Sequence, residues 1–135
     1  MFGALDVSAS GLMAQRYRLN TIAANLANVN TTRDANGEAN PYRRQVALLQ
    51  SAVVPGAPGA VGVQALGAVA DPAPFRLEFD PTHPDASDDG YVQYPNVDVM
   101  TETVDALAAT RAYEANIAAI EATKSMVTAA LRILA

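Results

Sequence analysis

LDVSASGLMAQRYRLNTIAANLANVNTT, residues 5–32, is the stretch that decides the fold. Along it leucine recurs every seven residues, and a β-branched residue follows three residues after the last two leucines. This seam consists of Leu5, Leu12, Leu19, Ile22, Leu26 and Val29. Such spacing is typical of helices that wrap around one another. It therefore predicts a helix from about Leu5 to Thr32 whose role is packing rather than catalysis.

A short polar seam lies beside the apolar one, because Thr21, Asn25, Asn28 and Thr32 step by four, three and four residues. A solvated helix face is one interpretation, although such a face usually carries lysine and glutamate. Short amides and hydroxyls can instead hydrogen-bond across an interface and fix the register of two helices. We favour the second interpretation, and Asn116 and Thr123, one heptad apart, are candidates for the same role.

The partner of this helix is predicted at the other end of the chain, where a helical pattern runs from about Val97 to the last residue. Its seam steps by four and three residues through Tyr113, Ile117, Ile120, Lys124, Val127, Leu131 and Leu134. Met100, Val104 and Leu107 follow a shifted register, which predicts a bend or stutter near Thr110. The chain ends in LRILA, and an apolar end is expected to dock against something.

Residues 33–96 separate the two helices and predict an extended or small β insert. Strand signals occur in PYRRQVALLQS (41–51), at 61–64, at 65–70, in FRLEF (75–79) and in YVQY (91–94), with Asn36-Gly37 as a turn. The predicted fold class is mainly α, with long N- and C-terminal helices paired as an antiparallel coiled coil. Residues 1–32 and 97–135 would form one domain, and 33–96 an insert.

Composition excludes several classes of function. A net charge of −5 offers no basic footprint for nucleic acid, and the absence of cysteine removes disulfides and thiolate chemistry. The N-terminus lacks a basic region followed by an apolar core, so we expect no cleaved signal peptide. Proline and glycine break the uncharged run 45–70, which argues against a membrane span. The first helix alone buries too little apolar surface to offset its ordering entropy, so we expect it to need partners.

The loop from Asp80 to Asp89 is the one stretch that suggests chemistry. Asp85, Ser87 and Asp89 match positions one, three and five of a calcium loop, but position twelve is Asn96 instead of glutamate. His83, the sole histidine, has no nucleophile elbow or zinc motif around it. We interpret the loop as an acidic surface turn, with a small metal-binding protein as the alternative. We therefore expect no enzyme activity, catalytic residue, metal or cofactor, and we expect Arg43-Arg44 to pair with acidic groups.

Four segments carry a resemblance to a known family: AANLANVNTT (23–32), PYRRQ (41–45), FDPTHPDASDDGYVQYPNVD (79–98) and RAYEANIAAIEATKSMVTAALRIL (111–134). Together they resemble the FlgC family of bacterial flagellar basal-body rod proteins, which are proximal rod subunits among the flagellar axial proteins. The first and last segments look like elements shared with other rod and hook subunits, which form the alternative assignment.

The resemblance implies a structural, torque-transmitting subunit whose terminal helices line a tube while the middle segment faces outward. It implies export through the flagellar type III apparatus without a cleaved signal, and a place in the rod within the cell envelope. The implied partners are other copies of the chain, other rod proteins, and components of the membrane ring and export apparatus, with no nucleic acid and no direct membrane span.

We expect the predicted assembly residues to pack between helices or between subunits. The resemblance implies this role for three residues of the first motif, Asn25, Asn28 and Thr31. It implies the same role for four residues of the last motif, Arg111, Tyr113, Glu114 and Asn116. The full set is Leu5, Leu12, Leu19, Ile22, Asn25, Leu26, Asn28, Val29, Thr31, Arg111, Tyr113, Glu114, Asn116, Ile117, Ile120, Val127, Leu131 and Leu134.

Overall fold

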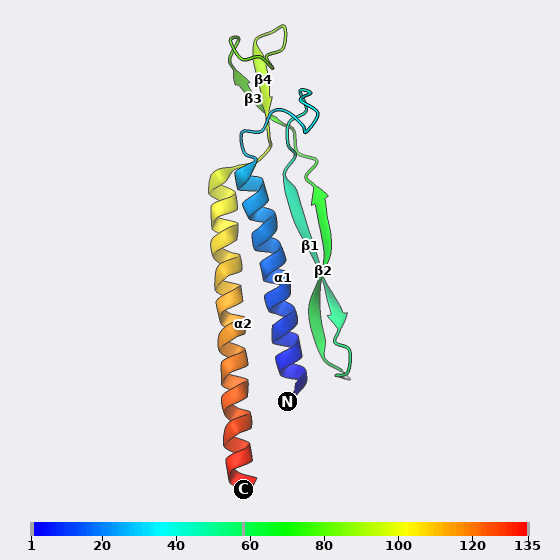
Figure 1. The fold of residues 1–135 in the computed structure, drawn as a ribbon, viewed down its shortest axis with the longest axis vertical. Helices are drawn as coiled ribbons and strands as arrows, with labels where there is room; N and C mark the ends of the chain where they lie inside the picture. The colour runs from blue at the N-terminus through cyan, green and yellow to red at the C-terminus, as the bar shows by residue number, and fades with distance from the viewer. Residues whose placement is uncertain (1, 58, 135) are drawn as a thin grey trace. The chain divides into compact units, whose positions relative to one another are not determined.

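The computed structural model describes residues 2–57 and 59–134, with the side chains of Phe2 and Leu134 left out. Along the chain, one long helix precedes four strands and a second long helix follows them (Figure 1). In chain order the elements are α1 (Phe2–Ala27), β1 (Gln45–Val53), β2 (Val61–Ala70), β3 (Arg76–Phe79), β4 (Tyr91–Tyr94) and α2 (Val99–Leu134). β1 pairs with β2 in one two-stranded sheet, and β3 pairs with β4 in another.

The chain folds as two compact units, and each contains parts of both helices and of the middle segment. Unit 1 comprises residues 1–19, 47–67 and 106–135, and unit 2 comprises residues 20–46 and 68–105. No helix within the described ranges is both long enough and apolar enough to cross a membrane.

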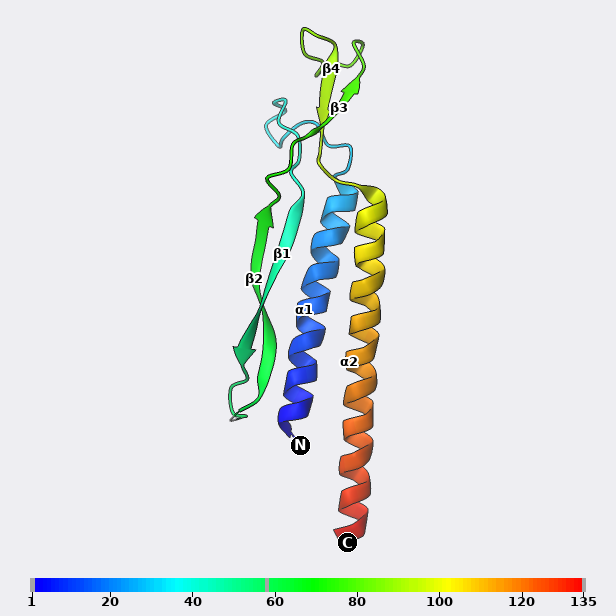
Figure 2. The ribbon, with the colours of Figure 1, turned by 180° about the vertical axis from the view of Figure 1, so that it is seen from behind.

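In unit 1, α1 lies between α2 and the sheet of β1 and β2, and the two helices run in opposite directions, as both views show (Figure 1, Figure 2). Small residues allow this close approach. A Cβ added at Gly11 would lie 2.9 Å from Nδ2 of Asn116, and one added at Gly62 would collide with the Ser10 hydroxyl. Ala14 and Ala109 are buried. This part of α1 is thus covered on two sides, which fits a helix whose charged residues are limited to Asp6, Arg16 and Arg18.

The core of unit 2 consists of Ile22, Val92, Pro95 and Val97, all buried, together with the polar side chains of Asn25 and Glu102. β3 and β4 are antiparallel, with Arg76 opposite Tyr94 and Phe79 opposite Tyr91. On the exposed face the rings of Phe79 and Tyr91 meet edge to face, with centroids 5.3 Å apart.

Local chemistry explains where the helices begin and end. α1 ends at Ala27, earlier than predicted, because the Asn28 side chain donates to the Ala24 carbonyl (2.9 Å) and the chain turns. α2 begins after Asp98, whose carboxylate accepts the backbone N–H groups of Met100 and Thr101. The same carboxylate also accepts a hydrogen bond from the Thr101 hydroxyl. That bond, followed by those from the two N–H groups, lowers the pKa of Asp98.

Most of the predicted elements are confirmed. Two long helices and short antiparallel strands are present, and the strand signals at 61–64 and 65–70 belong to the single strand β2. α2 is one unbroken helix from Val99 to Leu134, so the bend or stutter predicted near Thr110 does not interrupt it. The covered positions Glu102, Ala109, Asn116 and Thr123 keep one seven-residue repeat on both sides of Thr110, whereas Met100, Val104 and Leu107 of the shifted register are exposed.

Candidate functional site

The centre of unit 2 is a buried amide, Asn25, which is 1% exposed. Its Nδ2 donates to the Gln45 carbonyl (2.8 Å) and to Oε2 of Glu102 (3.1 Å). Its Oδ1 accepts from the Gln45 N–H (2.9 Å) and from the Tyr42 hydroxyl (3.0 Å). The amide therefore makes all four hydrogen bonds available to it. In this way α1, the segment that leads into β1, and α2 share one polar anchor.

Glu102, fully buried, is held by a cation from that same segment. Nε of Arg44 lies 2.6 Å from Oε1 of Glu102, and Nη1 lies 3.1 Å from Oδ2 of Asp71. Burial lowers the pKa of Arg44, but the hydrogen bonds to Glu102 and Asp71 outweigh this and the net direction is upward. Burial, with the charge of Glu102 adding to it, raises the pKa of Tyr42. The buried carboxylate is thus paired and hydrogen-bonded on both oxygens, which is the condition for tolerating a charge in a protein interior.

Asn96 closes the network on the side of the strands. Its Oδ1 accepts the Arg44 N–H (2.9 Å), and its Nδ2 donates to the carbonyls of Asp71 (3.3 Å) and Ala73 (3.1 Å). The Asp71 carboxylate accepts the Ala73 N–H, and this bond, followed by that from Arg44, lowers the pKa of Asp71. The prediction that Arg43 and Arg44 meet acidic groups is confirmed for Arg44. Nη1 of Arg43 instead donates to the backbone carbonyls of Asp71 (3.0 Å) and Ala73 (2.9 Å).

A separate ion pair in unit 2 ties the segment that follows α1 to the acidic loop. Nη2 of Arg33 lies 2.6 Å from Oδ1 of Asp85, while its Nε and the Thr32 hydroxyl donate to Oδ2 (3.1 and 2.9 Å). The Asp85 side chain is 6% exposed, and the bond from Arg33, ahead of the other causes, lowers its pKa. Nδ1 of His83 accepts the Asp85 N–H (3.1 Å). Asp85 therefore serves as a structural acceptor.

The same contacts bear on the metal-binding alternative. Both oxygens of Asp85 already accept hydrogen bonds, and Asp80 binds the hydroxyl and N–H of Thr82. In residues 2–57 and 59–134, no three histidine, cysteine, aspartate or glutamate side chains gather as a metal site would require. The contacts of the described loop therefore give no reason to prefer a metal-binding loop to an acidic surface turn.

The predicted assembly residues divide between covered and exposed positions. Half or fully buried are Leu5, Leu12, Leu19, Ile22, Asn25, Leu26, Asn28, Val29, Thr31, Tyr113, Asn116, Ile120 and Val127. Exposed are Arg111, Glu114, Ile117 and Leu131, and the side chain of Leu134 lies outside the described part. The covered face of α2 carries Glu102, Ala109, Asn116 and Thr123, which repeat every seven residues. The packing roles of all these residues remain predictions.

Sequence reasoning missed Glu102, Tyr42, Asn96 and Asp71 as members of the network. For Glu102 the sequence does hold a signal, because Glu102 lies two heptads before Asn116 and so extends the polar repeat of Asn116 and Thr123. The other three lie in the middle segment, where no periodicity relates them to the helices.

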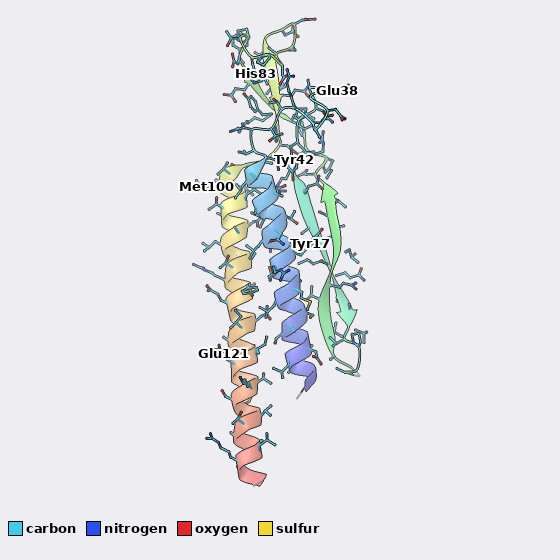
Figure 3. All side chains as sticks on the ribbon, in the orientation of Figure 1. Tyr17, Glu38, Tyr42, His83, Met100 and Glu121 are labelled. Atoms are coloured by element: carbon cyan, nitrogen blue, oxygen red, sulfur yellow. The ribbon has the colours of Figure 1, made fainter. Side chains whose placement is uncertain are left out.

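Large apolar side chains are exposed over much of α2. In unit 2, Met100 is 71% and Val104 60% exposed, and Figure 3 shows Met100 on the side of α2 away from α1. In unit 1, Leu131 is 62% and Ile133 85% exposed. Exposed apolar residues in such numbers mark surfaces that bind other proteins.

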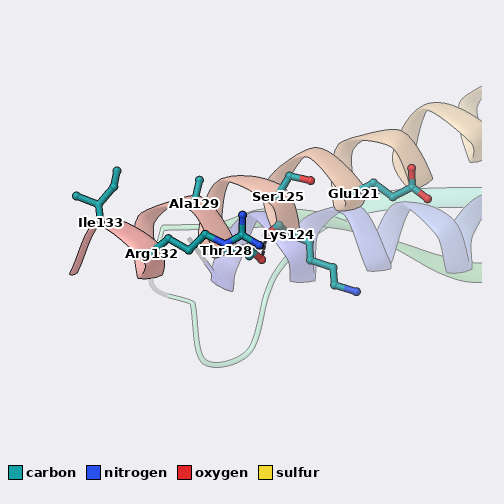
Figure 4. Close-up of a pocket in the computed structure, with 7 residues that line it drawn as sticks. All are labelled: Glu121, Lys124, Ser125, Thr128, Ala129, Arg132 and Ile133. Carbon is teal, nitrogen blue, oxygen red and sulfur yellow. Dashed lines mark hydrogen bonds between the residues drawn. The ribbon is translucent and has the colours of Figure 1, made fainter. Parts of the chain in front are cut away.

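The last turns of α2 extend past the beginning of α1 in unit 1 (Figure 2). Around them Glu121, Lys124, Ser125, Thr128, Ala129, Arg132 and Ile133 line a shallow hollow on one side of the helix (Figure 4). We call residues 121–133 the α2 end. Its exposed apolar residues and its two cations make it a candidate contact surface.

Two family descriptions match the ends of the chain. Residues 5–33 match the family described as Flagella basal body rod protein, and residues 88–133 match the one described as Flagellar basal body rod FlgEFG protein C-terminal. Both matches fall on the helices and on the segments that supply Asn25 and Glu102. They define the class as that of the flagellar basal-body rod proteins.

Full-length relatives narrow the class. A Flagellar basal-body rod protein FlgC of Bacillus subtilis (strain 168) is 46% identical, over 98% of this chain and 97% of the relative. A protein of the same name from Borreliella burgdorferi is 39% identical, over 99% of this chain and 97% of the relative. Another from Aquifex aeolicus is 38% identical, over 93% of this chain and 91% of the relative. The chain belongs to the FlgC family of flagellar basal-body rod proteins. This is a family of structural proteins and not of enzymes.

Proposed function

We propose that this chain is a structural subunit of the proximal rod in the flagellar basal body, where it assembles with copies of itself and with other rod proteins and transmits torque through their packing. The observation that carries the proposal, beside family membership, is the apolar α2 end. Leu131 and Ile133 are 62% and 85% exposed at the tip of a long helix. Side chains of this kind are stabilised by burial against a partner.

We propose further that α1 and α2 pair as an antiparallel coiled coil. Gly11 faces Asn116 in unit 1, and Asn25 bonds Glu102 in unit 2. Gly11 and Asn25 are two heptads apart on α1, and Asn116 and Glu102 are two heptads apart on α2. Both contacts thus obey one antiparallel register, which is what a heptad-based pairing requires.

In the assembled rod, residues 1–32 and 97–135 would form the axial core and residues 33–96 an outward-facing insert. The predicted motif residues at exposed positions, such as Arg111 and Glu114, would then meet neighbouring subunits. Delivery would use the flagellar type III export apparatus without a cleaved signal. A subunit that orders fully only against partners suits transport in an unfolded state. Components of the membrane ring would be further partners in the cell envelope.

Complementation tests the function. In a strain lacking its own FlgC-family subunit, this chain should restore swimming and be recovered in purified basal bodies. Ile133→Asp should reduce both, because a carboxylate replaces a side chain that is buried on assembly. Ala35→Asp, in an exposed turn, adds the same charge and should leave both unchanged.

Two results would contradict these proposals. If the unaltered chain enters basal bodies in no detectable amount, the rod function is wrong. If Ile133→Asp swims at the speed of the unaltered chain, the α2 end is not buried in the rod, although the chain remains a subunit.

A further inference from the structure

A groove in unit 1 offers a place for the α2 end. It has a volume of about 510 Å³ and lies between the first half of α1 and the sheet of β1 and β2. Its lining is mostly apolar, and Met13 and Val53 within it are 73% and 72% exposed. Among the described side chains that line it, Asp6 is the one that carries a charge. The groove therefore fits an apolar segment that carries positive charge.

The α2 end has this chemistry. Met126, Leu131 and Ile133 are 60%, 62% and 85% exposed. Lys124 and Arg132 outnumber Glu121, so the charge of residues 121–133 is positive, opposite to that of Asp6. The lengths also agree, since Asp6 to Met13 on α1 and Met126 to Ile133 on α2 each comprise eight residues, and the seven rises between their ends give roughly 10 Å.

In unit 1, α1 separates α2 from the sheet of β1 and β2 (Figure 1, Figure 2), and the exposed tip of the α2 end lies far from the groove of its own chain. Asn116 contacts Gly11, which lies beside Met13 on α1. Leu131 is fifteen residues, roughly 22 Å, further along α2 from Asn116, since an α-helix rises 1.5 Å per residue. A second copy of the chain is free of this restriction.

We propose that the α2 end of one copy docks in the groove between α1 and the β1–β2 sheet of the next copy, with Arg132 and Lys124 facing Asp6. The contact joins two different surfaces, so it is head-to-tail and adds copies in one direction instead of closing a symmetric dimer. This inference rests on the proposed function, because it describes a contact between copies in the rod.

Cysteine cross-linking tests the contact, and the chain has no cysteine of its own. Basal bodies are purified from cells that depend on a Met13→Cys/Leu131→Cys variant and are treated with a short bis-maleimide. The matched control is Met13→Cys/Val104→Cys, since Val104 and Leu131 are equally exposed apolar residues of α2, at 60% and 62%. Docking predicts a ladder of cross-linked copies for the first variant and not for the control.

Charge reversal provides a second measurement. Asp6→Arg or Arg132→Asp alone should lower the cross-linking yield roughly twofold to fivefold, the range expected for an exposed ion pair. The two reversals together should restore it. Swimming of the same cells reports separately whether the rod has formed.

The outcomes separate the two proposals. The docking is wrong, and the rod function stands, if cells with Met13→Cys/Leu131→Cys swim but their basal bodies give no ladder. The same conclusion follows if the cysteine at position 131 cross-links to another rod protein instead of to the cysteine at position 13. The docking is also wrong if neither Asp6→Arg nor Arg132→Asp changes the cross-linking yield. Absence of the unaltered chain from basal bodies overturns the rod function itself.

Discussion

Replacing Asn25 with alanine tests the anchor of unit 2. The change removes four hydrogen bonds of 2.8 to 3.1 Å, three to neutral partners and one to Glu102. With about 1 kcal/mol for each neutral bond and about 2 kcal/mol for the charged one, the sum is about 5 kcal/mol. Water can enter the space that the amide leaves, so we expect a loss of about 3 kcal/mol in the free energy of unfolding. This is a large share of the 5 to 15 kcal/mol typical of a folded domain.

The assay is urea unfolding followed by circular dichroism, with trimethylamine N-oxide present to favour the folded chain. Asn28→Ala is the matched control, since Asn28 belongs to the same polar seam but donates within its own helix end, to the Ala24 carbonyl. It should cost less than about 1 kcal/mol. If Asn25→Ala is as stable as Asn28→Ala, the network does not anchor α1 to α2 and the reasoning fails.

Three further predictions concern the neighbouring contacts. Arg44→Lys should lower the free energy of unfolding by about 1 to 2 kcal/mol, because an ammonium group cannot bond Glu102 and Asp71 as a guanidinium does; a variant as stable as the parent in urea would contradict this. In the folded chain the pKa of Asp85 lies below its usual range. The ionised Asp85 carboxylate therefore stabilises the folded chain fully at pH values above its pKa in the unfolded chain, about 3.9. This stabilisation is lost as the pH falls through the lower pKa that Asp85 has in the folded chain. The stability difference between the parent and Asp85→Asn, measured from pH 6 to pH 2.5, should therefore shrink as the pH falls, and a difference that grows would refute the ion pair. Gly11→Leu should destabilise the chain by about 1 to 3 kcal/mol by overpacking against Asn116, and Asn116→Ala should recover part of the loss; equal losses in both backgrounds would show that the helices do not meet there.

The repeating parts of the chain were predictable because helix and strand periodicity are local. The leucine seam of residues 5–32 predicts α1, the alternation in FRLEF predicts β3, and the short run YVQY predicts β4. The covered face of α2 was harder, because small and polar residues line it at Ala109, Asn116 and Thr123 while larger apolar residues such as Leu131 are exposed. A hydrophobicity pattern follows large side chains, whereas close helix contact depends on small ones.

The polar network was half visible in the sequence. An amide on a helix seam suggests an interface, which points to Asn25, and paired arginines need acidic partners, which points to Arg44. Neither of these signals marks Glu102, and a glutamate in the first turn of a helix is ordinarily solvent-exposed and favoured there by the helix dipole. Its burial depends on Arg44 and Asn25 arriving from segments 58 and 77 residues away.

By itself the sequence determined two long helices, a β middle segment and the family to which the chain belongs, since these follow from local periodicity and from contiguous motifs. Only the tertiary structure decided that Asn25, Arg44 and Glu102 form one buried network, which face of α2 is covered, and that a groove lies beside α1. These features depend on distances between residues far apart in the chain, and a linear pattern does not contain those distances.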